Sequence, residues 1–378
     1  QIIIRERITN DIVYDSNKME NDESQFVSIP SLKRNKYGYA WQVKVWDKDN
    51  QESEWSSPHH FRIAPSSIDA KWIGAITKKE AHIPEGRWSN TDFKKDTFKQ
   101  QWAKVDSLST KSIILRKDFK TKKDIVDATI YISGLGHYEL QINGVKVGED
   151  EFAPLISEYD KTVYYNTIDV TKYLKSLRHN AMQVILGNGF FNVQKDGRYS
   201  KLQTSFGPPQ MICMLEINYD DGTQQTIKSD NTWKWCLSPI TFNSIYGGES
   251  YDATLEGTMP WHNVVITEGP KGTLTPQIAP PIRIMERYGI KSWQYVPSLS
   301  LAERAREMKR TNISPTAIIA DMGQNLAGFP EISISGKRGQ KVIIYVGEKL
   351  TKHGVVNQRE TGRPHYYEYT LRGNGIDI

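Results

Sequence analysis

The sequence predicts an all-β protein that consists of consecutive β-sandwich domains. Apolar and polar residues alternate along many short segments, and this two-residue period is that of a strand with one buried face. Turns rich in glycine and asparagine separate the segments, whereas helical periodicity is scarce. The chain has 378 residues, of which 38% are hydrophobic. This length predicts two or three domains with their own cores, and many short strands are typical of sandwiches.

Two segments give the clearest hairpin signals. Residues 138–142 alternate strictly, and Asn143-Gly144 then supplies the positive φ values of a tight turn. Residues 211–219 lead into a second turn at Asp220-Asp221-Gly222. Both patterns predict neighbouring antiparallel strands inside one domain.

Other segments are less regular. Residues 332–334 lead through two glycines into the apolar run 342–345, which predicts a third hairpin. Residues 169–177 allow a short helical turn, and Leu299 to Lys309 could form three turns of helix. The polar stretch 77–111 has no clear period, so we expect a long surface excursion there.

Two breaks divide the chain into three modules. Pro65 follows a strand and cannot donate to a continuing ladder, and a cluster of prolines and glycines near residues 269–281 marks a second boundary. We therefore predict β-sandwiches at 1–64, 65–275 and 276–378. The first is expected to lack its first strand and the third to be incomplete.

Composition excludes several classes of protein. The 49 basic and 44 acidic residues are spread along the whole chain, unlike the clustered basic face of a nucleic-acid binder. No apolar stretch approaches the roughly 20 residues of a membrane span. Cys213 and Cys236 could pair across neighbouring strands, but buried free thiols are favoured. The compartment stays open, with a periplasmic or extracellular location favoured over the cytoplasm.

The segments that resemble a cofactor or metal motif each lack a residue that the motif requires. Gly134-Leu-Gly136 begins like a dinucleotide loop, but Glu139 stands where a third glycine is needed and a hairpin follows instead of a helix. Residues 47–50 resemble part of a calcium loop without its glycine or distal glutamate. His59 and His60 would point to opposite faces of a strand. We expect neither cofactor nor metal.

Three motif blocks, in this order, carry a family resemblance. They are Gly134-Leu-Gly-His-Tyr-Glu-Leu-Gln-Ile-Asn-Gly144, Tyr246-Gly-Gly-Glu-Ser-Tyr-Asp-Ala253 and Asp321-Met-Gly-Gln-Asn-Leu-Ala-Gly328. Together they resemble the front part of bacterial α-L-rhamnosidases, glycoside hydrolase family 78. The segment Tyr39 to Ser56, with its aromatic strand and Ser-Glu-Trp-Ser turn, is similar to a fibronectin type III module.

The resemblance implies a fibronectin type III-like module, a jelly-roll-like module and a further β-sandwich. It also implies that the acid and base of an inverting hydrolysis of terminal L-rhamnose lie in a following α-barrel, so we expect no catalytic residue in this chain. The expected partners are a rhamnose-containing glycan or glycoside and that barrel in the same polypeptide. The alternative is a stand-alone carbohydrate-binding or cell-surface protein without an enzyme.

Local chemistry favours sugar binding over catalysis. Glu249 and Asp252 are three residues apart on an expected strand, so they would face apart instead of forming a carboxylate pair. Amide, carboxylate and aromatic groups suited to a sugar occur at Asn188, Phe190, Phe191, Tyr251 and Asp252. The structural alternative is that the aromatic rings fill the core and that Asn188 lies in a turn.

A third motif is interpreted as structural. Asp321, Gln324 and Asn325 belong to a segment that looks like an ordered turn at a domain interface.

Overall fold

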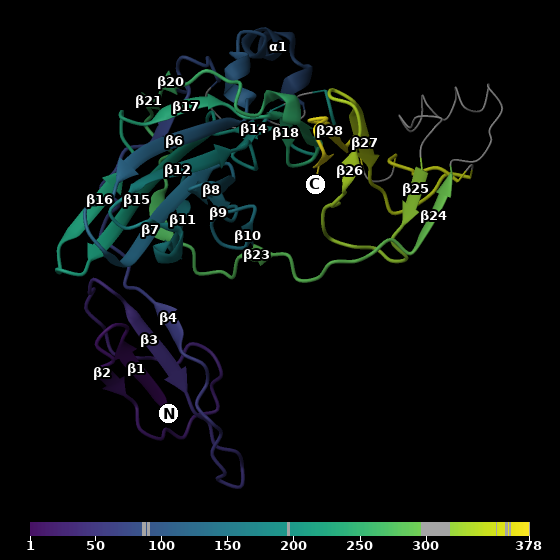
Figure 1. The fold of residues 1–378 in the computed structure, drawn as a ribbon. Coiled ribbons are helices and arrows are strands. Elements are labelled where there is room, and N and C mark those ends of the chain that lie inside the picture. The colour runs from purple at the N-terminus through teal and green to yellow at the C-terminus, as the bar shows by residue number, and fades with distance from the viewer. Residues whose placement is uncertain are drawn as a thin grey trace.

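The structure is a computed structural model that describes residues 1–84, 88, 91–194, 197–295, 318–352, 354–359, 362 and 364–377. The helix expected at Leu299 to Lys309 lies outside these residues. A small sheet at the N-terminal end, a large central sandwich and a group of C-terminal strands follow one another (Figure 1). The expectation of an all-β fold is confirmed.

The first sheet is antiparallel and has the order β2-β1-β3-β4. Its strands are β1 at Ile2–Glu6, β2 at Ile12–Asp15, β3 at Tyr39–Val43 and β4 at His59–Phe61. Ile4 and Tyr39 are buried on one face of this sheet. The Tyr39 ring stacks on Phe61 with 5.5 Å between centroids, so alternate side chains build a small core.

The central sandwich consists of two large sheets. One has the order β21-β5-β15-β7-β11-β22, with β16 paired to β15; its strands are β5 Ile73–Gly74, β7 Ile125–Leu135, β11 Thr162–Asp169, β15 Gln210–Tyr219, β16 Gln224–Lys228, β21 Val265–Ile266 and β22 Thr273–Pro276. The other has the order β20-β17-β6-β12-β8-β9, with β6 Ile113–Lys120, β8 Tyr138–Ile142, β9 Val145–Lys146, β12 His179–Leu186, β17 Lys234–Leu237 and β20 His262–Asn263.

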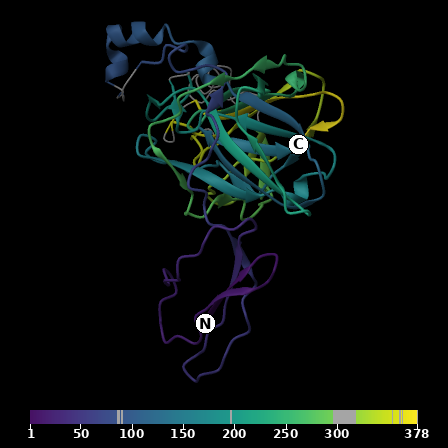
Figure 2. The same ribbon diagram turned by 90° about the vertical axis from the view of Figure 1, so that its left-hand side faces the viewer.

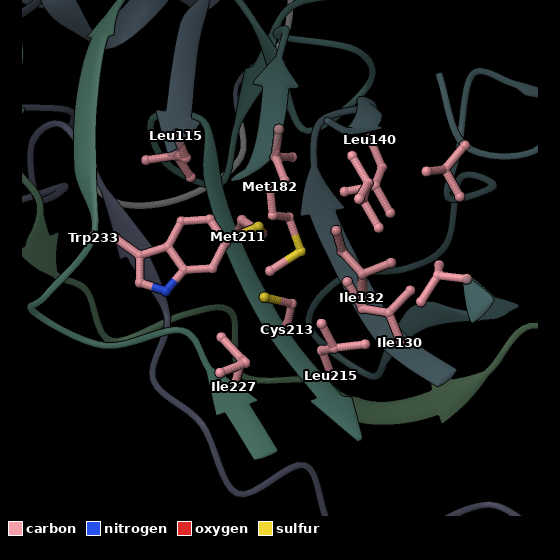
Figure 3. Close-up of a cluster of buried hydrophobic side chains, with 14 of the residues drawn as sticks. Leu115, Ile130, Ile132, Leu140, Met182, Met211, Cys213, Leu215, Ile227 and Trp233 are labelled. Atoms are coloured by element: carbon pink, nitrogen blue, oxygen red, sulfur yellow. The ribbon is translucent and has the colours of Figure 1, made fainter. Parts of the chain in front are cut away.

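The core of the protein lies between these two sheets (Figure 3). Leu115 and Leu140 from one sheet face Ile130 and Leu215 from the other, and Trp233 closes one side; all five are at most 2% exposed. Burying one such side chain contributes about 1.5–3 kcal/mol. Cys213 and Cys236 are buried free thiols, as expected.

The two clear hairpin predictions are confirmed. Asn143 and Gly144 have φ values of 53° and 81°, and they join β8 to β9. Gly222, with φ of 78°, joins β15 to β16. In both cases the alternation and the turn residues together determine the register of the strands.

The C-terminal strands form a sheet that crosses the boundary expected near residue 275. Its order is β18-β19-β28-β27, with β18 at Ile240–Ser244, β19 at Gly248–Asp252, β28 at Tyr366–Thr370 and β27 at Lys341–Tyr345. Because β19 pairs in parallel with β28, the segment that closes the middle module is continuous with the third.

The third hairpin prediction was wrong. The strand β26 (Ile334–Ser335) pairs with β29 (Ile376–Asp377), whereas β27 pairs with β28. Leu371 is fully buried, and its N–H donates to the Gln340 carbonyl at 2.8 Å, which brings β27 to β28. Alternation shows which face of a strand is buried but does not select its partner.

Three two-stranded ribbons complete the strands in the described part of the chain. They pair β10 (Asp150–Glu151) with β23 (Ile282–Arg283), β13 (Asn192–Val193) with β14 (Thr204–Ser205), and β24 (Ser292–Tyr295) with β25 (Ile318–Asp321). The chain leaves β22 as an extended segment and reaches β24 at the far side of the molecule (Figure 1).

The excursion between β5 and β6 contains the helix α1 at Asp96–Trp102. It lies at the end of the molecule opposite to the first sheet (Figure 2). Short 3-10 helices occur at Asp92–Lys94, Ser107–Thr110, Thr171–Tyr173 and Ala253–Leu255. None of the helices among the described residues is long and apolar enough to span a membrane.

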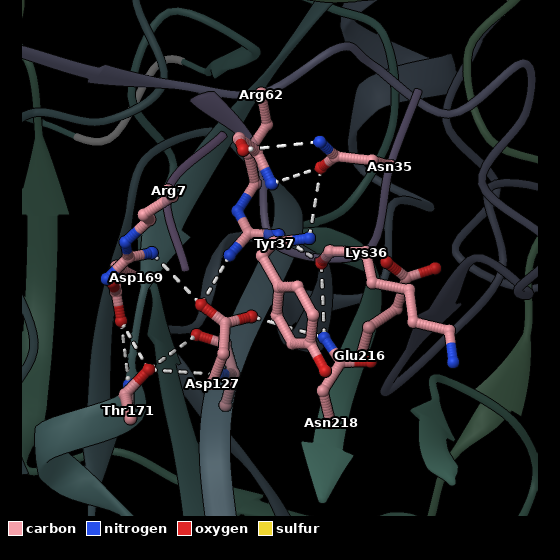
Figure 4. A network of polar contacts seen from close by, with 12 residues as sticks. Arg7, Asn35, Lys36, Tyr37, Arg62, Asp127, Asp169, Thr171, Glu216 and Asn218 are labelled. Carbon is pink, nitrogen blue, oxygen red and sulfur yellow. Dashed lines mark hydrogen bonds and ion pairs between the residues drawn. The ribbon is translucent and has the colours of Figure 1, made fainter. Parts of the chain in front are cut away.

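Ion pairs join the first sheet to the central sandwich (Figure 4). Asp127 on β7 is 1% exposed, and its carboxylate accepts from Arg7 at 3.0 Å and from Arg62 at 2.5 Å. Arg7 also reaches Asp169 at 2.5 Å. We call this group of Arg7, Arg62, Asp127 and Asp169 the N-terminal seam.

Candidate ligand-binding site

A cavity of about 590 Å³ lies between the α1 excursion and the central sandwich. Three segments that are far apart in the sequence line it. They are the excursion with Phe93 and Trp102, the loop after β12 with Asn188 and Asn192, and β18 with Asn243. A cavity of this size is in the range of small-molecule sites.

A chain of buried amide groups forms the floor of the cavity. Asn188 donates from Nδ2 to the Thr110 carbonyl at 2.7 Å, and its Oδ1 accepts from Asn192 Nδ2 at 2.8 Å. Gln194 in turn donates from Nε2 to Asn192 Oδ1 at 3.0 Å. Asn188 and Asn192 are 4% and 2% exposed. These amides are therefore held in fixed orientations by one another and by the backbone.

Two donors at the cavity have no partner among the described residues. They are the indole Nε1–H of Trp102 and the side-chain Nδ2 of Asn243, both buried. The other end of the Asn243 amide is fixed, because Oδ1 accepts from the backbone N–H of Asn188 at 2.6 Å. Leaving a buried donor unpaired costs about 1–3 kcal/mol. Each of these two atoms has less than 1 Å² of accessible surface, so neither faces the open space of the cavity.

The structure places the first three predicted sugar-binding residues around one loop. Asn188 lines the cavity. The Phe190 ring lies edge-on to Tyr246, with 6.0 Å between the ring centroids. Phe191 is fully buried and packs against Tyr159 and Phe206, so its ring has no free face for a sugar.

The other two lie in the C-terminal sheet and do not line the cavity. The Tyr251 ring stacks on Tyr369 at 5.6 Å, and its hydroxyl donates to Glu256 at 2.8 Å. Asp252 accepts from the Thr254 N–H at 2.9 Å and so caps the 3-10 helix that follows. The five predicted residues do not converge on one pocket.

The predicted interface motif forms a tight turn after β25. Asp321 accepts from the Gly323 N–H at 2.7 Å, and Gly323 has a positive φ of 78°. Gln324 and Asn325 are exposed.

Glu249 and Asp252 are not arranged as the carboxylate pair that glycoside hydrolysis requires. Glu249 is opposite Asn243 in the β18–β19 register, whereas Asp252 is engaged at the end of β19. Burial raises the pKa of Glu249, and the nearby charge of Glu139 raises it further. Among the described residues, no three His, Cys, Asp or Glu side chains gather closely enough to hold a metal ion.

Sequence reasoning missed Phe93, Trp102 and Asn243. The first two lie in the excursion, where no two- or four-residue period marks a buried face. The sequence signal that could have marked this segment is its group of aromatic residues, which pack together in the structure. The rings of Phe93 and Trp102 lie 5.6 Å apart, and the rings of Trp88 and Trp102 lie 5.0 Å apart.

Comparison with known families gives three matches in the order of the motifs. Residues 1–67 match the Rha78A-like N-terminal immunoglobulin domain, residues 123–286 the alpha-L-rhamnosidase N-terminal domain, and residues 311–378 the bacterial alpha-L-rhamnosidase concanavalin-like domain. An alpha-L-rhamnosidase of Formosa agariphila is 33% identical over 377 residues, which are 96% of this chain and 38% of that protein. The chain corresponds to the N-terminal part of an α-L-rhamnosidase.

Other relatives agree. An alpha-L-rhamnosidase of Alteromonas is 28% identical and matches 91% of the chain and 35% of its own length. The solved alpha-L-rhamnosidase of Dictyoglomus thermophilum has a TM-score of 0.74 and 26% identity, covering 100% of this chain and 40% of that one. The chain therefore spans less than half the length of these relatives, and the resemblance to family 78 is confirmed.

One further solved structure supports the fold alone. The Streptomyces avermitilis α-L-rhamnosidase complexed with L-rhamnose has a TM-score of 0.72 at 20% identity, and the match covers 100% of this chain and 50% of that one.

Proposed function

We propose that this chain is the non-catalytic front half of an enzyme that hydrolyses terminal L-rhamnose from glycosides or polysaccharides with inversion. The observation that carries the proposal is the ordered match of three rhamnosidase domains along the chain. The catalytic α-barrel would lie in the same polypeptide and would supply the acid and the base. In the chain itself, Glu249 and Asp252 are committed to a packed position and to a helix cap.

A hydrolysis assay tests this proposal. The purified chain should not cleave a chromogenic α-L-rhamnoside, whereas the same chain extended by the remaining domains should. Turnover by the chain alone that disappears in Glu249→Gln or Asp252→Asn would overturn it. Asparagine also caps helices well, so Asp252→Asn separates the loss of a carboxylate from the loss of the cap.

The partner in this proposal is the catalytic domain, and exposed apolar side chains support it. Ile278, Met285, Trp293 and Tyr295 are 89%, 85%, 64% and 81% exposed along the segment that leads to β24. Several large apolar side chains left exposed in one segment are typical of an interaction site. Hydrogen exchange at residues 282–295 should slow when the remaining domains are present, and unchanged exchange would remove this support.

We also propose the module division 1–64, 65–275 and 276–378, with a fibronectin type III-like first module and a jelly-roll-like second one. The β18–β19 pair of the second module would serve as a shared sheet with the third. Sugar binding by the middle module is proposed on Asn188 and Phe190, with Tyr251 and Asp252 as a separate group on β19.

The competing function is a stand-alone carbohydrate-binding protein. The cavity of about 590 Å³ beside the excursion favours ligand binding without bearing on hydrolysis. The two functions differ in the assay above: a binding protein would show no rhamnosidase activity in any longer form.

A further inference from the structure

We propose that Asn374 is a site of spontaneous deamidation, at which this chain converts one of its own asparagines to aspartate and isoaspartate. The residue stands in the turn between β28 and β29 and is followed by Gly375. The reaction needs neither a ligand nor a catalytic domain, so it goes beyond the proposed function.

The sequence contains three asparagines that precede a glycine. They are Asn143, Asn188 and Asn374. A glycine has no Cβ to hinder the approach of its backbone nitrogen to the preceding side chain, and this approach is the first step of deamidation. The sequence alone therefore marks three equal candidates, and the surroundings of each side chain distinguish them.

The amide of Asn143 is held at both ends. Its Nδ2 donates to the Tyr173 carbonyl at 2.8 Å and to Asn180 Oδ1 at 2.9 Å. Its Oδ1 accepts from the Ala181 N–H at 3.0 Å. Since the hairpin turn fixes the backbone here as well, the side chain cannot swing toward the nitrogen of Gly144 without breaking these hydrogen bonds.

The amide of Asn188 is also held, and it is shielded from water. Only 4% of the residue is exposed. Its Nδ2 donates to the Thr110 carbonyl at 2.7 Å, and its Oδ1 accepts from Asn192 at 2.8 Å. Reaction at this position therefore requires the loop after β12 to open first.

Asn374 is exposed, and no hydrogen bond to its side chain is present in the part of the chain that the structure describes. The turn is packed before this residue, because a Cβ on Gly373 would lie 2.3 Å from the backbone nitrogen of Arg338. After it the turn is open, since a Cβ on Gly375 would meet nothing within 4 Å. The carboxamide and the next backbone nitrogen can therefore approach each other with water at hand.

The reaction uses water as its only co-reactant. The Gly375 nitrogen attacks Cγ of Asn374 and loses its proton to the solvent, which closes a succinimide ring. The bond between Cγ and Nδ2 breaks, and ammonia leaves. Water then opens the ring at one of its two carbonyls and gives either aspartate or isoaspartate, in which the main chain runs through Cγ. Because base removes the proton of the attacking nitrogen, the rate should rise with pH.

The product changes the connection between two strands. Asp377 on β29 is 3% exposed and accepts from the Arg372 N–H at 3.0 Å, and β29 pairs with β26. Isoaspartate lengthens the main chain between Arg372 and Asp377 by one carbon, so the pairing of β29 should weaken. Aspartate adds a negative charge but leaves the length of the main chain unchanged.

The test is incubation of the folded chain in water enriched in heavy oxygen, followed by peptide mapping with mass spectrometry. The peptide that contains Asn374 should take up heavy oxygen, and faster at mildly alkaline than at neutral pH. Uptake at Asn143 and Asn188 should be roughly a hundred-fold slower, because their hydrogen bonds have to open first. In the urea-unfolded chain all three positions should react at similar rates, since each has the same following residue.

Two variants separate the reaction from its consequence. Asn374→Gln should abolish the uptake, because its longer side chain disfavours ring closure. Asn374→Asp carries the charge of one product on an unaltered main chain. After incubation, the amides of β26 and β29 should exchange hydrogen several-fold faster in the wild type than in Asn374→Gln, and fresh Asn374→Asp should resemble the unreacted wild type.

Two results overturn the proposal. One is a folded chain in which Asn374 stays unlabelled over the time in which the unfolded chain reacts at all three positions. The other is labelling at Asn143 or Asn188 that is as fast as labelling at Asn374 in the folded chain.

Discussion

The central sandwich meets its two neighbours in opposite electrostatic ways. At the N-terminal seam, buried Asp127 is compensated by Arg7 and Arg62. On the other side, where β18–β19 joins the C-terminal strands, Glu249 lies near Glu139, and no ion pair to Glu249 is present in the described part of the chain. Tyr367 is opposite Glu249 in the pairing of β19 with β28. We call this group of Glu249, Glu139 and Tyr367 the C-terminal seam.

The difference shows how each neighbour is held. Among the residues that the structure describes, the first sheet shares no strand pairing with the central sheets, so charged side chains supply much of the specificity of its docking. The C-terminal strands are joined by the backbone ladder between β19 and β28. That ladder can hold a carboxylate in a packed position without a compensating cation. The two seams should therefore respond oppositely to loss of a carboxyl charge.

The largest effect is expected at Asp127. Asp127→Ala leaves Arg7 and Arg62 without their shared partner, and breaking a buried ion pair in this way costs about 3–5 kcal/mol. Urea unfolding should show this loss, together with faster proteolysis between the first sheet and the central sandwich. Asp118→Ala is the matched control, because Asp118 is 62% exposed and its removal should cost less than about 1 kcal/mol. A loss that small at Asp127 would show that the N-terminal seam does not depend on charge.

Most of the central fold could be predicted from the sequence, because local rules determine it. Asn143-Gly144 demands a tight turn, and the alternation on both sides of it shows which side chains are buried. The pairing of β26 with β29 and of β19 with β28 could not be predicted in this way. These pairs join residues far apart in the sequence, and many exposed positions in the C-terminal strands leave their alternation weak.

The candidate site was less predictable than the fold. Asn188 was found because its amide suits a sugar, but Phe191, chosen for its aromatic ring on the same grounds, is a core residue. Trp102 and Asn243 become neighbours of one cavity only through the position of the excursion over β18. Whether a side-chain donor finds a partner depends on such neighbours, so the unpaired donors of both residues could not be predicted from the sequence.

Acid should weaken the N-terminal seam. Burial raises the pKa of Asp169, but hydrogen bonds from Thr171 and Arg7 outweigh it, so its pKa in the folded chain is lowered. A depressed carboxyl pKa contributes stability above the unfolded value of about 3.9 and loses it as pH falls through the folded value. Because the side chain is 43% exposed, screening limits this contribution to about 1 kcal/mol.

The measurement is unfolding free energy between pH 7 and pH 2 for the wild type and Asp169→Asn. The two proteins should differ at neutral pH and converge in acid. If the variant keeps the same deficit at low pH, the loss comes from packing and not from the charge of Asp169.

The smallest effect is expected at the C-terminal seam and has the opposite sign. Burial raises the pKa of Glu249, with Glu139 adding to the rise. A carboxyl group with a raised folded pKa binds its proton more tightly in the folded state. Stability therefore decreases as pH rises from the unfolded value of about 4.3 through the folded value. At pH 7 the charge opposes folding, so Glu249→Gln should stabilise the chain by about 0.5 kcal/mol.

The pH dependence of this gain and a control variant on the same sheet both test the prediction. The gain from Glu249→Gln should vanish below about pH 4, where the wild-type carboxyl is neutral as well. Glu368 on β28 accepts from Lys341 at 2.9 Å, and Glu368→Gln should lower stability slightly instead. If Glu249→Gln destabilised the chain at pH 7, Glu249 would have to be held by a favourable partner. The two seams would then be compensated alike, and the β19–β28 ladder would no longer account for the difference between them.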